Sequence, residues 1–176
     1  MQDSHSLKVK CGLDILRLGE SCAMSVKLIS KCGIYCGACY IYRAFKDGGK
    51  LLEITAEKLG VAKEEIRCNG CLGSVEDIWR MCKKCPFRAC LQERKLAFCY
   101  ECPEFEDSTC AKYESAREFA SKRGENIKEA HERIKAGDTD RWLKEQDEKW
   151  RCTSCGASIY WTQEVCHHCG KPIHRV

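Results

Sequence analysis

The seventeen cysteines of this 176-residue chain are its residues with the clearest chemistry, and most of them stand in pairs separated by two residues. A C-x2-C pair lets two thiolates from one tight turn bind the same metal ion, and two pairs complete a tetrahedral four-thiolate zinc site. The spacing therefore predicts that most of the cysteines are metal ligands. The predicted ligands are Cys32, Cys36, Cys39, Cys68, Cys71, Cys82, Cys85, Cys90, Cys99, Cys102, Cys110, Cys152, Cys155, Cys166 and Cys169.

The last four of these cysteines form the most regular group, two C-x2-C pairs ten residues apart within residues 150–176. A glycine, Gly156 or Gly170, directly follows each pair and frees the backbone for the turn around a metal ion. The pattern predicts a β zinc ribbon that folds by itself around one zinc ion, with Ile159–Trp161 as the strand between the pairs.

The eleven cysteines of residues 32–110 can be grouped in more than one way. In chain order, the first site is Cys68, Cys71, Cys82 and Cys85, the second is Cys90, Cys99, Cys102 and Cys110, and the remainder is Cys32, Cys36 and Cys39. A site of three thiols keeps one position open for chemistry or takes a fourth thiol from elsewhere. The alternative is two closed sites of interleaved pairs with three cysteines left over. We favour the three-site version, and expect three or four zinc ions per chain.

The spacing Cys32-x3-Cys36-x2-Cys39 is also the one by which radical-SAM enzymes hold a four-iron cluster. Two features argue against that class of enzyme. Ala38 stands where those enzymes usually have an aromatic residue, and the chain lacks the alternating strands and helices of their partial barrel. An iron–sulfur cluster bound by the upstream cysteines remains the alternative to zinc, because thiolates bind both.

Short helices are expected to position the upstream cysteines. Apolar side chains recur with helical spacing over residues 40–47 and again over 51–59, and Gly48 and Gly60 end the two runs. A further helix is expected to reach about residue 122, with Ser108 or Thr109 as its N-cap. In the stretch between these helices, Phe87, Cys90, Leu91 and Arg94 are expected on one face of another helix.

Residues 125–149 are rich in charge and helical in period, which predicts a packed helical linker. Gly137 separates two helices there. The apolar positions are Ile127, Ala130 and Ile134 in the first helix and Trp142, Leu143 and Trp150 in the second. His131 does not belong to an H-E-x-x-H zinc motif, because position 135 is lysine, and we expect it on a solvated face.

The composition favours metal over disulfides. Hydrophobic residues make up 44% of the chain only because cysteine is counted among them, so that hydrophobic burial alone is thin and metal is expected to supplement it. A disulfide-rich secreted protein is expected to have a signal peptide, which the first residues do not resemble, and an even number of cysteines. We therefore expect a cytoplasmic protein. No stretch approaches the roughly twenty apolar residues of a membrane span.

The formal net charge of +4 does not predict a nucleic-acid partner. Each zinc ion held by four thiolates contributes a net charge of about −2, and three such sites bring the loaded protein close to neutrality. A protein partner is the expectation, and nucleic-acid binding through aromatic side chains of the C-terminal ribbon is the alternative.

The stretches CGIYCGACYIY, CNGC, CKKCPFRAC and FCYECPEFEDSTC together resemble a family of small cysteine-rich proteins of unknown function from bacteria and archaea. The resemblance covers about residues 30–115. It implies metal binding, with zinc as the expected metal and no established activity. Some members are similar in ending with a helical segment and a zinc ribbon.

These observations predict a mostly α, metal-stabilised domain followed by a β zinc ribbon. The expected divisions are an extension at 1–26 with Cys11, Cys22 and an alternative start at Met24, a cysteine-rich domain at 27–124, a linker at 125–149 and the ribbon at 150–176. No nucleotide-binding loop or hydrolase motif is present, so the expected function is binding or interaction around structural zinc in preference to catalysis. The alternative is an iron–sulfur protein that transfers electrons or uses an open cluster at Cys32, Cys36 and Cys39.

Overall fold

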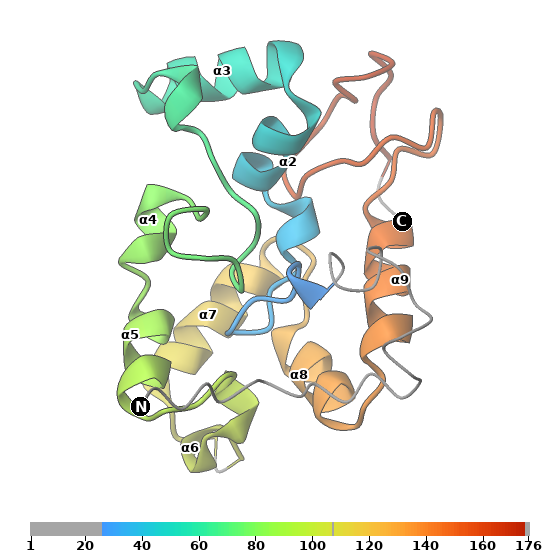
Figure 1. Ribbon diagram of the computed structural model, residues 1–176. Coiled ribbons are helices and arrows are strands. Elements are labelled where there is room, and N and C mark those ends of the chain that lie inside the picture. The colour runs from blue at the N-terminus through green and yellow to red at the C-terminus, as the bar shows by residue number, and fades with distance from the viewer. Residues whose placement is uncertain (1–25, 107, 175–176) are drawn as a thin grey trace, which may run out of the picture.

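The computed structural model describes residues 26–106 and 108–174, and within them the chain is mostly helical (Figure 1). The α-helices are α2 (Tyr40–Asp47), α3 (Gly49–Leu59), α4 (Arg80–Lys83), α5 (Pro86–Glu93), α6 (Pro103–Glu106), α7 (Ala111–Ser121), α8 (Ile127–Lys135) and α9 (Thr139–Lys149). The 3-10 turns are η1 (Cys36–Ala38), η2 (Lys63–Glu65) and η3 (Cys99–Glu101). The expected extension lies outside the described residues except for Val26, and Cys11, Cys22 and Met24 lie outside them too.

The first two helices follow the predicted pattern of apolar residues and glycines. α2 buries Ile41 and Ala44, and Gly48, with a φ of 66°, separates it from α3. α3 ends at Gly60, whose left-handed φ of 62° lets its N–H group bond back to the last turn. Both helices are therefore confirmed.

Helices α5 and α7 begin in different ways. Pro86 begins α5, where its missing N–H group costs nothing. The N-cap of α7 is Cys110, and the prediction of Ser108 or Thr109 is wrong. Ser108 instead adopts a positive φ of 54°, which turns the chain before the helix begins.

Helices α8 and α9 occupy the predicted linker. The Asn126 side chain accepts a hydrogen bond from the N–H group of Glu129 and so caps α8. Gly137, at a φ of 84°, separates the two helices as predicted. Figure 1 shows α8 and α9 next to each other, with the C-terminal loops continuing past α2.

The largest cluster of buried side chains joins the two ends of the described chain. It contains Ile29 and Tyr35 from the start, Trp142 from α9, and Ile159 and Trp161 from the C-terminal segment. The rings of Tyr35 and Trp142 meet edge to face at 6.0 Å between centroids. The C-terminal segment therefore shares its core with the helical part of the protein.

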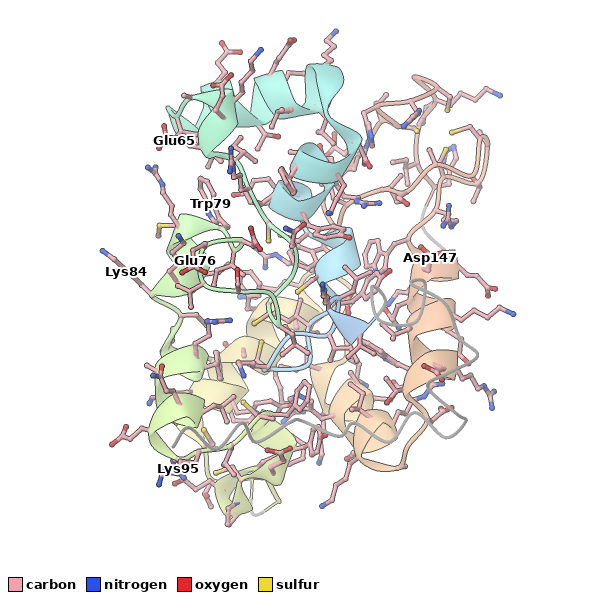
Figure 2. The ribbon with its side chains drawn as sticks, in the orientation of Figure 1. Glu65, Glu76, Trp79, Lys84, Lys95 and Asp147 are labelled. Carbon is pink, nitrogen blue, oxygen red and sulfur yellow. The ribbon has the colours of Figure 1, made fainter. Side chains whose placement is uncertain are left out.

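Two smaller clusters surround upstream cysteines. One contains Cys32 and Cys99 with Leu91 and Tyr113, and the other contains Cys68 with side chains of α2 and α3. Figure 2 shows sulfur atoms within the body of the protein, and Trp79 lies between α3 and α4 beside this second group. The thiols are thus part of the interior.

The predicted β ribbon is not formed, because the described residues contain no strand. The C-terminal segment makes two single antiparallel bridges, Arg151 with Ser158 and Val165 with Pro172. The N–H group of Ile159 donates to the carbonyl of Trp150 at 2.9 Å beside the first bridge, but the expected strand goes no further, since the N–H group of Trp161 donates to the carbonyl of Ala38, 3.0 Å away. The segment is a pair of turns docked on the helical domain.

None of the helices in the described ranges has both the length and the apolar character needed to cross a membrane.

Candidate metal centre

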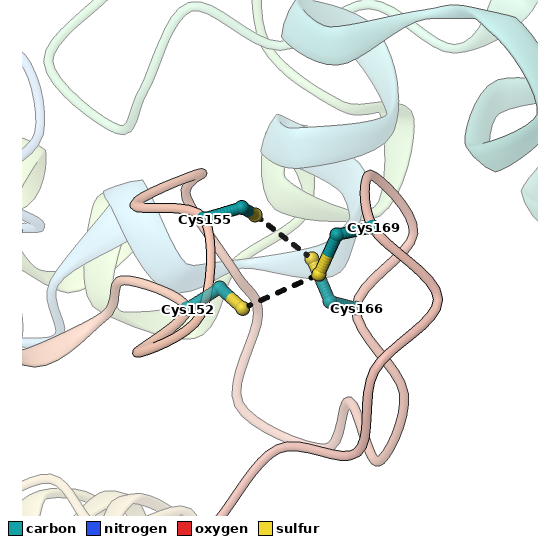
Figure 3. Close-up of side chains that lie close together, drawn as sticks. All are labelled: Cys152, Cys155, Cys166 and Cys169. Atoms are coloured by element: carbon teal, nitrogen blue, oxygen red, sulfur yellow. Dashed lines mark hydrogen bonds between the residues drawn. The ribbon is translucent and has the colours of Figure 1, made fainter.

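Four cysteine side chains converge in the C-terminal segment, namely Cys152, Cys155, Cys166 and Cys169 (Figure 3). All four sulfur atoms lie within 4.8 Å of one another. The sulfur atoms of Cys152 and Cys169 are 3.8 Å apart, and those of Cys155 and Cys166 are 3.7 Å apart. Tetrahedral zinc with Zn–S distances of about 2.3 Å requires sulfur separations of about 3.8 Å. The arrangement therefore fits one four-coordinate metal ion.

Each cysteine pair is shaped by a turn that the following glycine closes. The N–H group of Gly156 donates to the carbonyl of Cys152 at 2.8 Å, and the N–H group of Gly170 donates to the carbonyl of Cys166 at 2.9 Å. Both glycines have left-handed backbones, with φ values of 73° and 70°. The local sequence thus determines the shape of each half of the site, and the two halves form the same kind of turn.

Backbone dipoles make the first thiol of the site acidic. The N–H groups of Ser154 and Cys155 point at the sulfur of Cys152 and lower the pKa of that thiol to about 6. Cys152 and Cys166 are buried, while Cys155 and Cys169 are exposed. Since the thiolate is the form that binds metal, the turn prepares Cys152 for coordination.

Side-chain contacts on two sides of the site connect it to the helical domain. The indole Nε1 of Trp161 donates to the buried Glu125 carboxylate at 3.3 Å. On the other side, Nε2 of His167 lies 3.2 Å from a carboxylate oxygen of Asp47, the last residue of α2. His167 lies between two of the ligands in sequence, so the metal centre and α2 are directly linked.

The upstream cysteines are brought near one another in two neighbourhoods without reaching the same closeness. Within the described residues, the C-terminal group alone gathers its ligand atoms within 4.8 Å. The first neighbourhood contains Cys36, Cys39, Cys68, Cys71, Cys82 and Cys85. Burial raises the pKa of Cys82 to about 12, and the charges of Cys39 and Cys68 add to that rise. The N–H group of Cys71 meanwhile points at the sulfur of Cys36.

The second neighbourhood contains Cys32, Cys90, Cys99, Cys102 and Cys110. Burial raises the pKa of Cys99, and the charges of the other four thiols raise it further, that of Cys32 most. The structure therefore places Cys32 beside Cys99, in a different cluster from Cys39 and Cys68. Chain order does not reveal this separation of Cys32 from its neighbours in sequence.

His131 is fully buried, and its predicted place on a solvated face is wrong. Its ring packs against Tyr100, Phe105 and Tyr113. The Tyr113 hydroxyl donates to the carbonyl of Ile127, so it accepts the hydrogen bond from Nδ1 of His131 at 3.0 Å. The missed signal was periodicity: His131 falls on the apolar face of α8.

The fold and the site together define a mostly helical, cysteine-rich protein with a four-cysteine group able to hold a metal ion. The chain belongs to the family described as "Protein of unknown function (DUF3795)", whose model matches residues 28–115. No curated protein and no solved structure is significantly similar to the chain. The C-terminal four-cysteine group lies beyond the matched residues.

Proposed function

We propose that this protein binds one structural zinc ion through Cys152, Cys155, Cys166 and Cys169 and acts as an interaction module, not as an enzyme. The observation that carries the proposal is the set of sulfur separations, 3.7 and 3.8 Å, which fit a zinc tetrahedron. Thiolate sulfur is a soft donor, and four-thiolate tetrahedral sites are typical of zinc.

The contacts of the segment support a structural role for the ion. Four protein thiolates complete the coordination of zinc and leave no position for a substrate. Closing the two turns on one ion fixes the residues between and beside them, including Trp161 on Ala38 and His167 on Asp47. The zinc would therefore hold the C-terminal segment against the helical domain.

The aromatic side chains of the segment favour a protein partner over a nucleic acid. Base stacking requires exposed rings. Trp161 is only 8% exposed and its indole N–H group is bonded to Glu125, while Trp150 is 4% exposed. These two rings are packed in the core of the protein and are not exposed for stacking on a base.

Cobalt substitution tests the structural role. The full chain loaded with Co2+ should show the thiolate charge-transfer and tetrahedral d–d absorption bands, and cyanide or imidazole should leave these bands unchanged. Cys166→Ser should lose the ion of this site, whereas His168→Ala, which changes an exposed neighbour, should keep it. A shift on addition of imidazole that is seen in the unaltered protein and is absent from Cys166→Ser would show an open coordination position at this site and contradict a structural role.

Cross-linking of the full chain in cells, with separate detection of protein and nucleic-acid adducts, tests the interaction role. A protein adduct that is lost with Cys166→Ser and kept with His168→Ala is the expected result. Adducts formed with RNA or DNA alone would favour the alternative class of partner.

A further inference from the structure

A small cavity of about 30 Å3 lies between α5, η3 and α7, away from the C-terminal centre. Four cysteines line it, Cys90, Cys99, Cys102 and Cys110. The remaining walls are largely apolar, with Leu91 and Phe105 among them. The volume is large enough for one water-sized ligand or a metal ion. The four sulfur atoms do not yet lie within 4.8 Å of one another, so the thiols must turn inward to hold an ion.

The four cysteines lie in or beside α5, η3 and α7, which the fold brings around this cavity. Cys90 lies on the inner face of α5, and Cys99 and Cys102 form one C-x2-C turn across η3. The N–H group of Cys99 donates to the carbonyl of Lys31 at 3.0 Å, which fixes that turn against the start of the chain. Cys110 is the N-cap of α7, where the helix dipole favours a thiolate.

A cation stands beside these thiols on their outer side. The Nη1 group of Arg94 donates to the sulfur of Cys102 at 3.1 Å, and its Nη2 group bonds the carboxylate of Glu104. Lys112 also lines the cavity. A zinc ion with four thiolates carries a net charge of about −2, and these two cations, less the Glu104 carboxylate that also lines the cavity, offset about half of it. Outer groups of this kind orient metal ligands and tune metal affinity.

Cys32 is the competing ligand, and its position outside the cavity argues against it. It lies beside Cys99 in the same buried cluster but does not line the cavity. Its sulfur is 3.3 Å from the hydroxyl oxygen of Ser30, and the N–H group of Ile34 also points at it. The charges of Cys71 and Cys85 also act on Cys32, so its thiol faces the first neighbourhood as well as Cys99.

We propose that Cys90, Cys99, Cys102 and Cys110 bind a second zinc ion in this cavity, with Arg94 as the outer residue that positions Cys102. This centre ties α5, η3 and α7 together in the way that the C-terminal centre ties the last segment to α2. It is independent of the function proposed for the C-terminal site, whose four ligands it does not share.

Metal analysis of the full chain and two single variants tests the grouping. Cys110→Ser should contain one zinc ion fewer per chain than the unaltered protein, whereas Cys32→Ser, a matched change of a buried neighbouring thiol, should keep the full number. Loss of zinc from Cys32→Ser with retention in Cys110→Ser overturns the proposal. Iron with acid-labile sulfide in the unaltered protein that disappears in Cys110→Ser overturns the choice of zinc.

Two further variants keep the proposal testable if Cys110→Ser does not fold. Cys90→His substitutes an imidazole, which also binds zinc, so it should retain the ion and change the cobalt absorption spectrum. A folded Cys90→His protein with an unchanged cobalt spectrum overturns the proposal. Arg94→Ala should lower the zinc affinity of this centre about tenfold in chelator competition while leaving the C-terminal centre unchanged. An unchanged affinity removes Arg94 from its proposed role.

Discussion

The buried side chain of His131 makes the stability of the folded protein depend on pH. It is fully buried, and burial lowers its pKa to about 4 from an ordinary value of 6.5. Below pH 6.5 the unfolded chain takes up a proton that the folded protein does not bind. The stability contributed by neutral His131 is therefore complete above pH 6.5 and is lost as the pH falls toward 4.

A variant that cannot titrate should remove this dependence. We predict that His131→Gln, whose amide can still donate to Tyr113, gains about 1.5 kcal/mol relative to the unaltered protein when the pH is lowered from 7.5 to 5.5. Urea unfolding of both proteins at the two pH values measures the difference. A gap between the two proteins that does not change with pH would show that His131 is protonated freely in the folded state.

Gly70 is a second residue that packs against a part of the chain far away in the sequence. It lies inside the pair Cys68–Cys71 at a φ of 90°, and a Cβ atom there would come within 2.1 Å of the carbonyl oxygen of Lys27. Gly137 has a similar φ of 84°, yet a Cβ atom there would meet nothing within 4 Å. A comparison of alanine substitutions at the two glycines therefore distinguishes the cost of backbone strain from the cost of steric overlap.

We predict that Gly137→Ala costs about 1–2 kcal/mol, the strain of a left-handed residue with a side chain. Gly70→Ala should cost about 2–3 kcal/mol more, because the backbone of Lys27 must move as well. Denaturant unfolding of the two variants gives the comparison. Equal losses would mean that the turn at 68–71 is not packed against the start of the described chain.

At the scale of elements, the C-terminal segment is held by Trp161. Its backbone N–H group bonds Ala38, its indole bonds Glu125, and its ring belongs to the largest core cluster. We predict that Trp161→Ala lowers the free energy of unfolding by about 3–5 kcal/mol. Met81→Ala is the control, because Met81 is 67% exposed and should change stability by less than about 0.5 kcal/mol. A loss no larger than that of the control would contradict the docking.

The elements also show what a sequence pattern can and cannot predict. Helices α2, α3, α8 and α9 were predictable because apolar periodicity and terminal glycines are local signals. The strand at 159–161 was predicted wrongly, since the N–H group of Trp161 donates to Ala38, more than a hundred residues earlier. The burial of His131 was signalled locally by its place on the apolar face of α8, while the rings that cover it belong to residues 100–113 and could not be predicted from that face.

The same distinction applies to the cysteines. Residues 152–169 contain a complete site, so spacing alone predicted which four thiols meet. Every upstream C-x2-C pair has the same local form, and spacing cannot choose among partners for it. Tertiary packing makes the choice, for example by placing Cys32 in the cluster of Leu91 and Tyr113.

At the scale of the whole molecule, cysteines stand inside all three buried clusters. Without metal, these thiols contribute only the burial of a small apolar side chain. We predict that a strong zinc chelator removes most of the helical circular dichroism of the full chain, and that zinc restores it. A chelated protein that keeps its helical signal and a cooperative melt would show that the helical domain is stable without metal.

The shared core makes a last prediction about the C-terminal segment taken alone. A fragment of residues 148–176 contains all four ligands of its site, so it should bind one zinc ion, with the cobalt spectrum of a four-thiolate centre. In the full chain, however, Ile159 and Trp161 pack with Tyr35 and Trp142, which the fragment lacks. We therefore expect the indole of Trp161 to fluoresce as a solvent-exposed ring in the zinc-loaded fragment, and hydrogen exchange of its N–H group to be fast without the carbonyl of Ala38. Equal protection of that group in the fragment and in the full chain would show that the segment needs only its metal to fold.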